Sequence, residues 1–358
     1  MALNHRPRQG RILVLLPVGL GNLIMTTPAL RALSRGVGAE NVDVLALKPS
    51  TAAMTRSSGL FSETFAWDPD TEGLGRGIAL LRKLRSARFS HSLALFPSAT
   101  RKASVYQLAI GAADRLGFDY PNGSLPRTVQ HRSIPLEDTH DVYQNLRLVA
   151  AFLGQPLKDA VQPFFPIRAE APADLPAGPY FACHPGSSVE RGMGLKRLPA
   201  PLTAELIAGL SAMTGCSCVL VGGPEEAALR EEVAAGCRGA IVDVAIRSLE
   251  ETVGVLSRAR FFFGNDSGLM HLAAAVGTRC AAFFGPTDER RTGPFGWWEN
   301  DDGVPRHLIL RRPGTHPVWT LQTIGHNPPL GPQEGAQWTV DVSWALGELR
   351  RWFTKKPE

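Results

Sequence analysis

Short apolar runs alternate with segments of helical periodicity along most of the chain. In the first half, residues 11–16, 42–47 and 93–96 are apolar runs of the kind that form buried strands. Residues 26–35 and 78–84 instead space their apolar side chains as one face of a helix. Alternating β and α units of this kind predict a parallel sheet covered by helices.

The second half repeats this alternation. The expected strands are residues 180–183, 218–221, 240–244, 260–263 and 280–284. The expected helices are residues 202–213, 225–235, 249–257 and 272–276. Because no short-period repeat accompanies the pattern, we interpret it as the duplication of one doubly wound unit.

A proline-rich stretch separates the two halves. The helical pattern at 142–153 ends at Gly154, and residues 156–179 follow it. Near the end of the chain, Asp341 is placed as the N-cap of a basic amphipathic helix. Residues 300–337 show no periodicity and are expected to form an ordered loop. We therefore predict a first domain at 1–168, a second at 169–340 and a C-terminal helix at 341–358.

Composition supports a globular chain with two cores. A length of 358 residues exceeds what one core usually reaches, and 44% hydrophobic with 20% charged residues is typical of folded proteins. No apolar run approaches the roughly 18 residues of a membrane span, and no signal-peptide cleavage pattern follows the N-terminal arginines. The five cysteines lack paired metal-binding spacing. We expect a cytoplasmic protein with reduced thiols.

The net charge of +5 suits a nucleotide, an anionic glycolipid or an anionic membrane surface as a partner. Lys and Arg are dispersed along the chain rather than gathered in one basic block. Nucleic acid is therefore not an expected partner.

Polar, glycine-containing turns follow four of the expected strands. Residues 17–22 (Pro-Val-Gly-Leu-Gly-Asn) let backbone approach a ligand, although a tight turn without a ligand explains them equally well. Residues 183–188 (Cys-His-Pro-Gly-Ser-Ser), with Lys196 shortly after, offer hydroxyls and a cation to a diphosphate, but also suit a solvated loop.

The third turn, residues 264–271 (Gly-Asn-Asp-Ser-Gly-Leu-Met-His), runs from a strand into a helix. Amides, a hydroxyl and a carboxylate are then placed at the carboxyl edge of the sheet, where ligands bind in open α/β folds. Helix capping by Asp266 or Ser267 uses the same free N–H groups, so capping and ligand binding can coexist. The fourth turn, residues 284–288, is expected beside it and includes Thr287.

Together these segments resemble glycosyltransferase family nine, the bacterial heptosyltransferases, in order and spacing. The resembling segments are residues 12–33, 184–199, 222–226 and 264–296. The resemblance implies a GT-B fold: two Rossmann-like, doubly wound domains facing a central cleft, with the C-terminal helix returning to the N-terminal domain. It implies an acceptor-side first domain and a nucleotide-sugar-binding second domain.

The implied activity is that of an inverting glycosyltransferase. It would move a sugar, expected to be a heptose from ADP-heptose, from a nucleotide-diphosphate sugar to a hydroxyl of a saccharide or glycolipid such as lipopolysaccharide core. No cofactor is expected beyond the nucleotide-sugar co-substrate. No metal is expected either, because lysine and helix dipoles can stabilise the departing diphosphate and no paired carboxylates are flanked like a metal-binding Asp-x-Asp.

The resemblance also assigns residues to roles. Lys196 would pair with the donor diphosphate, and Glu225 or Glu226 would approach the nucleoside ribose. The other expected donor-side residues are Ser187, Ser188, Asp266, Ser267, Gly268, His271 and Thr287. On the acceptor side we expect Gly19, Gly21 and Arg101. Arg101, Lys102 and Arg127 suit contact with an anionic acceptor, but all three equally suit a solvated surface.

The sequence departs from the family at Asn22. Well-known members carry an aspartate in this turn, taken to be the general base, and an amide cannot accept a proton. Asn22 is retained as a catalytic candidate that orients the acceptor, and His184, Glu190 and Asp119 are unranked candidates for the base.

Three alternatives stay open. A catalytically reduced homologue that binds nucleotide sugar or glycan would keep the donor motifs, and a transferase acting on a natural-product acceptor would keep them too. A nucleotide-sugar epimerase of the same fold is disfavoured by residues 266–271. A glycolipid acceptor would require peripheral contact with the inner membrane.

Overall fold

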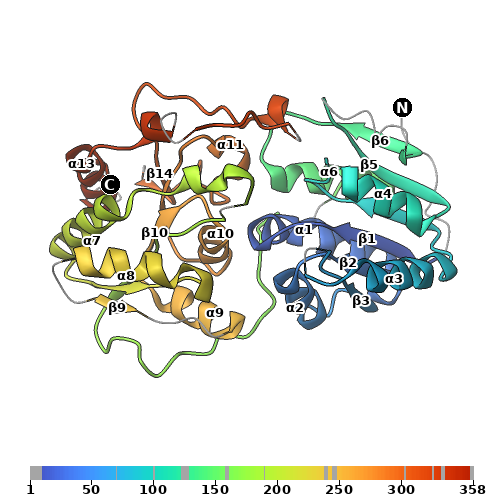
Figure 1. The fold of residues 1–358 in the computed structure, drawn as a ribbon, viewed down its shortest axis with the longest axis horizontal. Coiled ribbons are helices and arrows are strands. Elements are labelled where there is room, and N and C mark those ends of the chain that lie inside the picture. Colours follow the sequence, from blue (N-terminus) through green and yellow to red (C-terminus); the bar gives the residue numbers. More distant parts are fainter. Residues whose placement is uncertain are drawn as a thin grey trace. The chain divides into compact units, whose positions relative to one another are not determined.

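A computed structural model describes residues 10–69, 71–99, 101–121, 129–157, 161–188, 190–237, 241–243, 248–301, 304–324, 326–331 and 335–354. The chain divides into two compact units, which are described separately (Figure 1). Unit 1 comprises Met1–Pro166 with Leu321–Asn327, and unit 2 comprises Ile167–Thr320 with Pro328–Glu358. Sequence placed the division between residues 168 and 169. No helix in the described parts of the chain is both long and apolar enough to cross a bilayer.

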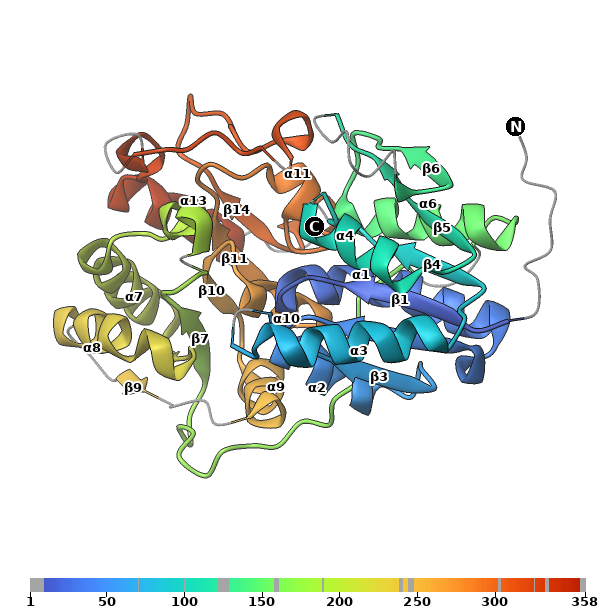
Figure 2. The same cartoon turned by 45° about the vertical axis from the view of Figure 1, so that its right-hand side comes forward.

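Unit 1 is built on a six-stranded, all-parallel sheet in the order β3-β2-β1-β4-β5-β6. Its strands are β1 (Ile12–Leu16), β2 (Val42–Ala46), β3 (Glu63–Ala66), β4 (His91–Ala94), β5 (Asp114–Asp119) and β6 (Arg132–Pro135). Its main helices are α1 (Leu20–Val37), α2 (Pro49–Ser57), α3 (Leu74–Ser86), α4 (Arg101–Ile110) and α6 (Asp141–Leu153). Helix α1 packs on α2 and α6, whereas α3 and α4 pack on each other (Figure 2).

Unit 2 has a second six-stranded parallel sheet, in the order β14-β11-β10-β7-β8-β9. Its strands are β7 (Tyr180–His184), β8 (Ser217–Leu220), β9 (Ile241–Asp243), β10 (Phe262–Asn265), β11 (Cys280–Phe283) and β14 (Leu308–Leu310). Its helices are α7 (Ala200–Thr214), α8 (Ala227–Gly236), α9 (Leu249–Arg258), α10 (Gly268–Ala275), α11 (Glu289–Thr292) and α13 (Val342–Thr354). A short antiparallel pair joins β12 (Asn300–Asp301) to β13 (Val304–Pro305).

Both sheets have the same winding. When the six strands of each unit are numbered in chain order, both sheets have the strand order 3-2-1-4-5-6. This is the order of a dinucleotide-binding Rossmann unit. The direction of winding reverses between β1 and β4 in unit 1 and between β7 and β10 in unit 2. The carboxyl end of the sheet at such a switch point is where open α/β folds bind ligands.

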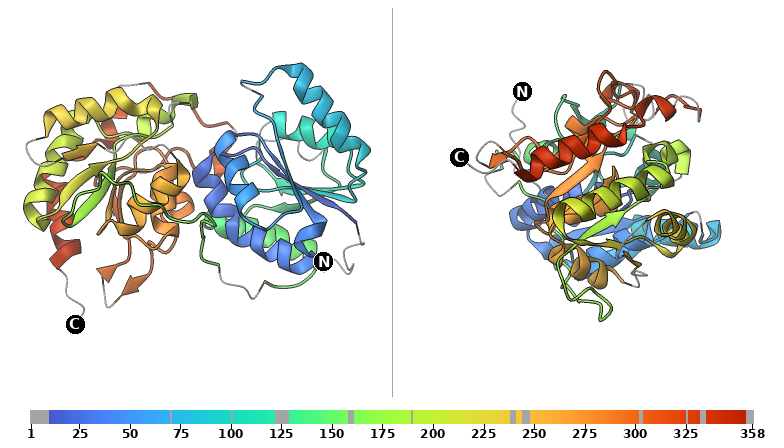
Figure 3. Two further views of the ribbon diagram at one scale, coloured as in Figure 1. Left: turned by 90° about the horizontal axis from the view of Figure 1, so that it is seen from below. Right: turned by 90° about the vertical axis from the view of Figure 1, so that its left-hand side faces the viewer.

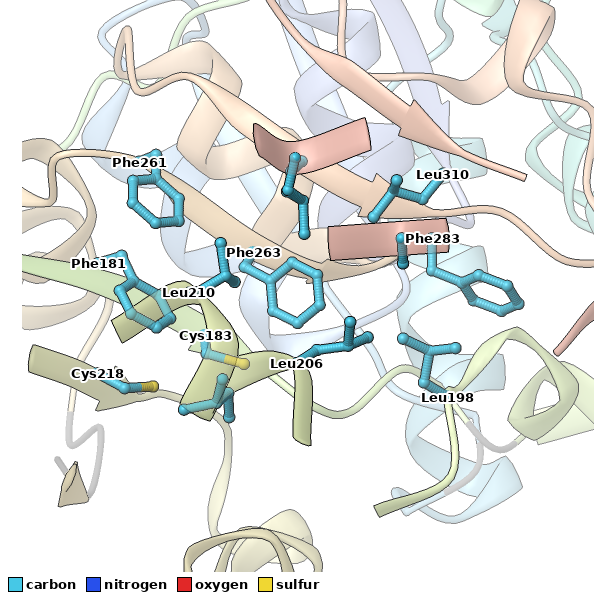
Figure 4. Packing of buried hydrophobic residues seen from close by; sticks show 14 of the residues in the cluster. Phe181, Cys183, Leu198, Leu206, Leu210, Cys218, Phe261, Phe263, Phe283 and Leu310 are labelled. Carbon is cyan, nitrogen blue, oxygen red and sulfur yellow. The ribbon is translucent and has the colours of Figure 1, made fainter. Parts of the chain in front are cut away.

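The core of unit 2 is rich in phenylalanine from its central strands. Phe181 and Phe261 stack with ring centroids 4.8 Å apart, and Figure 4 shows Phe263 and Phe283 in the same cluster. Leu206 and Leu210 of α7 close the cluster. Because β7 and β10 are buried along their whole length, they read as continuous apolar runs in the sequence.

The C-terminal helix completes this core. Asp341 caps α13 as expected, accepting a hydrogen bond of 2.9 Å from the Trp344 amide. Trp352 packs edge-on against Phe261, and the helix lies along α7 and β14 (Figure 3). These contacts belong to unit 2, and the expectation that the helix returns to the N-terminal domain stays a prediction. An amphipathic pattern shows that a helix must be covered on one face but does not show by which element.

Two expected boundaries also differ from the structure. Helix α1 begins at Leu20, six residues before the expected start, so the glycine turn is its first turn. Part of the expected loop at 300–337 forms β14, which pairs with β11. Three further strands, β3, β5 and β6, have mixed burial and no continuous apolar run to reveal them.

Candidate active site

Two neighbouring strands of the second sheet end at its switch point. β7 ends at His184 and β10 at Asn265, and Gly264 pairs with His184 in parallel register. A Cβ on Gly264 would lie 2.6 Å from the carbonyl oxygen of His184, so a larger residue would force the strands apart. The residues that follow both strands therefore meet at one edge of the sheet.

Asp266 is the centre of the first group of side chains. Its Oδ2 accepts hydrogen bonds from Lys196 Nζ at 2.8 Å and from Thr287 Oγ1 at 2.7 Å. Burial raises the pKa of Asp266, but the Lys196 ammonium, His271 and the two hydrogen bonds together lower it below its usual value. Asp266 is therefore an anion that fixes the position of the Lys196 ammonium.

His271 lies one helical turn after Ser267 on α10 and is 6% exposed. Burial and the nearby Lys196 lower its pKa, Asp266 opposes them, and the result is about 4. The ring is therefore neutral at pH 7. It can exchange hydrogen bonds with a ligand but brings no charge to one.

His184 bridges the two strand ends. Its Nδ1 lies 3.0 Å from Ser267 Oγ, and its Nε2 lies 2.8 Å from Glu226 Oε2. Burial raises the pKa of Glu226, but the hydrogen bond with His184 and the charge of Arg197 outweigh it, so the pKa lies below its usual value. With Glu226 ionised, we assign the ring proton to Nε2, so Nδ1 accepts from the Ser267 hydroxyl. Both ring nitrogens are then engaged, and His184 is poorly suited to be a general base.

Helix α10 begins at this edge. Ser267 is its N-cap and accepts a bond of 3.4 Å from the Met270 amide. The first N–H groups of a helix have no partners within the helix and favour an anion. Gly268 opens the helix without a side chain, and Lys196 is held beside its N-cap through Asp266. A cation and a helix N-terminus thus lie together.

Two residues that were not predicted as functional hold the loops of this edge in place. Asn265 Oδ1 accepts from the Leu198 amide at 3.0 Å, and its Nδ2 donates to the Pro185 carbonyl at 2.7 Å. Arg197 donates through Nε to the Ser187 carbonyl at 3.1 Å and lies 3.3 Å from Glu226. Their contacts join segments distant in the sequence, so local patterns gave no signal for them.

The remaining predicted donor-side residues differ in exposure. Ser187 is buried and donates to backbone carbonyls, whereas Ser188 is exposed. Of the two glutamates left open by the sequence, Glu226 is occupied by His184 and Arg197, and Glu225 is exposed. Glu225 is thus the carboxylate with surface available to a ribose.

The carboxyl edge of the first sheet carries amides and hydroxyls. Gly19 is the N-cap of α1, and Gly21 and Asn22 lie in its first turn, which has no acidic residue. After β4, the Ser98 amide donates to Tyr120 Oη at 2.8 Å. These residues flank the switch point between β1 and β4.

The other base candidates divide between the two units. Asp119 ends β5 and accepts a bond of 2.7 Å from Ser133 Oγ. The side chains of Glu190 and Arg101, and all of Arg127, lie outside the described residues.

Among the described residues, no group of three or more His, Cys, Asp or Glu side chains could hold a metal ion. The sequence also contains an Asp-Pro-Asp at 68–70, of which Asp70 lies outside the described residues. Metal independence remains a prediction.

Known proteins resemble this chain over most of its length. The sequence profile of glycosyltransferase family 9 (heptosyltransferase) matches residues 78–304. Lipopolysaccharide heptosyltransferase 1 of Salmonella typhimurium is 40% identical over 103 residues, which are 28% of this chain and 32% of that relative. The match thus spans about a third of the relative's length.

Solved structures agree in fold. The ADP-heptose lipopolysaccharide heptosyltransferase II of E. coli superposes with a TM-score of 0.67 at 19% identity, covering 96% of this chain and 98% of that one. A family 9 glycosyltransferase from Veillonella parvula gives a TM-score of 0.68 at 17% identity, covering 97% and 100%. At these identities the likeness establishes the GT-B fold alone.

The profile match covers more than half of the chain and extends over parts of both Rossmann-like units. The chain therefore belongs to glycosyltransferase family 9, the heptosyltransferase family.

Proposed function

We propose that the chain transfers a sugar from a nucleotide-diphosphate sugar to an acceptor hydroxyl, with ADP-heptose as the expected donor. The observation that carries the proposal is the 2.8 Å pair between Lys196 Nζ and Asp266 Oδ2 at the N-terminus of α10. A buried carboxylate holds an ammonium in place next to free helix N–H groups. That arrangement suits the two negative phosphates of a nucleoside diphosphate.

The same groups suit the departure of the diphosphate. In an inverting transfer, the acceptor oxygen bonds to the anomeric carbon as the bond from that carbon to the phosphate oxygen breaks. Negative charge then grows on the diphosphate, where Lys196 and the α10 amides stabilise it without rearrangement. The acceptor hydroxyl loses a proton, which the Asn22 amide cannot take up, so the proton passes to water or to one of the remaining candidate carboxylates, Asp119 and Glu190.

The comparisons support the substrate class. The E. coli structure is named as an ADP-heptose lipopolysaccharide heptosyltransferase, and the Salmonella relative as a lipopolysaccharide heptosyltransferase. For this chain, ADP-heptose as donor, lipopolysaccharide core as acceptor, inversion and a cytoplasmic location are parts of the proposal. Exposed Glu225 would meet the ribose hydroxyls, and buried Ser187 and exposed Ser188 would stay near the diphosphate.

Calorimetric titration of the full chain with ADP, UDP, GDP and ADP-heptose, in the presence of EDTA, tests the donor site. We expect ADP and ADP-heptose to bind, and Lys196→Met to weaken both at least about tenfold, which is about 1.4 kcal/mol. Arg312→Met removes an exposed cation of the same unit and is the matched control. No binding to any nucleotide by the wild type would overturn the donor assignment.

A binding subunit without transferase activity is the second candidate, and Asn22 in the first turn of α1 favours it. If the wild type binds ADP-heptose but releases no ADP with any saccharide, glycolipid or natural-product acceptor, while Asn22→Asp does, this candidate replaces the enzyme. If the wild type releases ADP and Asn22→Asp only changes the rate of release, the binding-subunit candidate is rejected.

A further inference from the structure

Unit 1 exposes large apolar side chains on two adjacent helices. Among the described residues, six large hydrophobic side chains are exposed, and four of them lie on α3 and α4. Leu74 is 75% and Ile78 50% exposed on α3, and Val105 is 54% and Leu108 52% exposed on α4. Since α3 and α4 pack side by side (Figure 2), these four exposed residues lie on two adjacent helices of the unit. Such clusters mark interaction sites more often than isolated exposed residues do.

On each helix, a cation lies at helical spacing from the two exposed apolar residues. On α3, Leu74, Ile78 and Arg82 follow at intervals of four residues and form one stripe. Gly77 and Leu84, which face the core, lie on another side of the helix.

On α4, Lys102, Val105 and Leu108 follow at intervals of three, and all three are exposed. We call the six residues of these two stripes the basic apolar face.

The charged residues of α3 and α4 are all positive. The sequences of α3 and α4 contain six Lys and Arg residues and no Asp or Glu. Two of the cations are paired outside the helices, Arg76 with Glu72 at 2.8 Å and Lys83 with Glu63 at 3.1 Å. Arg85 donates to the Ala109 carbonyl at 3.2 Å and so links the two helices. The exposed Arg82 and Lys102 carry positive charge at the apolar positions.

The face adjoins the functional edge of unit 1. Helices α3 and α4 begin at the carboxyl ends of their preceding strands, so Leu74, Ile78 and Lys102 lie towards that edge of the sheet. The turn at Gly19 follows β1 at the same edge.

We propose that the basic apolar face docks on an anionic lipid bilayer. Apolar side chains at this spacing enter the boundary between headgroups and acyl chains, while Arg and Lys extend to the lipid phosphates. A second copy of the chain fits less well, because a two-fold contact would bring Arg82 and Lys102 of each copy together. The proposal is independent of the transfer activity.

Flotation of the full chain with vesicles tests the docking. We expect it to float with phosphatidylcholine vesicles that contain about 30% phosphatidylglycerol, not with phosphatidylcholine alone, and to be released as salt rises. Ile78→Ser/Val105→Ser and Arg82→Glu/Lys102→Glu should each lower the bound fraction at least about tenfold. Val161→Ser, another exposed apolar residue, and Arg350→Glu, an exposed cation of α13, are matched controls. Thermal unfolding by circular dichroism shows whether each variant is folded.

The proposal is overturned if the wild type stays unbound to anionic vesicles at low salt, or if folded face variants bind as the wild type does. Loss of binding in the charge variant alone would overturn apolar insertion. A dimer in the absence of vesicles that Ile78→Ser/Val105→Ser dissociates would instead assign the face to a second copy. Because no nucleotide is present, failure here is distinct from failure of the donor titration.

Discussion

Asp266 is fully buried and yet charged, because its neighbours compensate for the lost water. Lys196 and Thr287 both donate to the same carboxylate oxygen. Such a pair is costly to bury and strongly destabilising to break, because one partner is then left as an uncompensated charge. The residue that would bind the diphosphate is thus also needed to balance a buried anion.

Stability and ligand binding can therefore be separated at this pair. We expect Lys196→Met to lower the free energy of unfolding by about 3 kcal/mol, because Asp266 loses its cation. Adding Asp266→Asn should recover most of that loss, since the buried charge is gone, without restoring nucleotide binding. Urea unfolding measures the first effect and calorimetry the second. A double variant as unstable as Lys196→Met would show that the charge balance is not the cause.

The sequence was sufficient to predict that the residues around Asp266 lie close together, but not to predict their contacts with the neighbouring loops. Asp266, Ser267 and Thr287 follow two adjacent strands, and strands of a parallel sheet end at one edge, so their proximity followed from the βα order. The role of Glu226 depends on contacts with His184 and Arg197, which are set by loop paths that no local pattern encodes.

At the scale of elements, helix α1 contains a proline that should weaken it. Pro28 has no N–H to give to the Ile24 carbonyl. Thr27 Oγ1 donates to that carbonyl instead, at 2.8 Å, and also accepts from the Phe164 amide at 3.0 Å. One buried hydroxyl therefore repairs the helix and holds the end of unit 1 against it.

Replacing this hydroxyl should be costly only while the proline is present. We expect Thr27→Val to lower the free energy of unfolding by about 2 kcal/mol, since it leaves buried backbone groups without partners. In a Pro28→Ala background the amide of the introduced alanine serves the Ile24 carbonyl, and the loss from Thr27→Val should fall by about half. Denaturant unfolding of the four proteins gives this coupling. Equal losses in both backgrounds would contradict the repair role.

Strands and helices were predictable to different degrees. The central strands β1, β7 and β10 are buried throughout and stand out as apolar runs. The start of α1 was placed too late, because glycine disfavours helices in isolation and here only packing overrides that preference.

For the whole molecule, duplication of the α/β alternation predicted two doubly wound units, and both sheets have the same strand order. The partner of the C-terminal helix could not be predicted in the same way. Its packing on α7 depends on which apolar surface the rest of unit 2 leaves uncovered.

Two buried histidines make the stability of the molecule depend on pH. Burial lowers the pKa of His271 to about 4 and that of His307 to about 3, against 6.5 in the unfolded chain. Below about pH 6.5 the unfolded chain takes up protons that the folded chain does not, so stability falls as pH falls. The expected slope is about 1.4 kcal/mol per pH unit for each histidine.

Denaturant unfolding between about pH 7 and pH 5 measures this slope. His271→Gln removes one titrating group and should reduce the slope by about half. A stability that is constant over this range would show that these rings are protonated in the folded chain.

The assignment of Leu321–Asn327 to unit 1 affects any attempt to divide the protein. The chain passes from one unit to the other at residues 166–167, 320–321 and 327–328, so neither unit is one uninterrupted stretch of sequence. Proteolysis at the first of these junctions alone would give residues 1–166 and residues 167–358 as separate chains, and residues 321–327 of the second product would still belong to the unit formed by the first. A gene fragment for residues 167–358 would encode seven residues whose native contacts are with the missing partner, and a well-behaved fragment would replace residues 321–327 with a short designed linker.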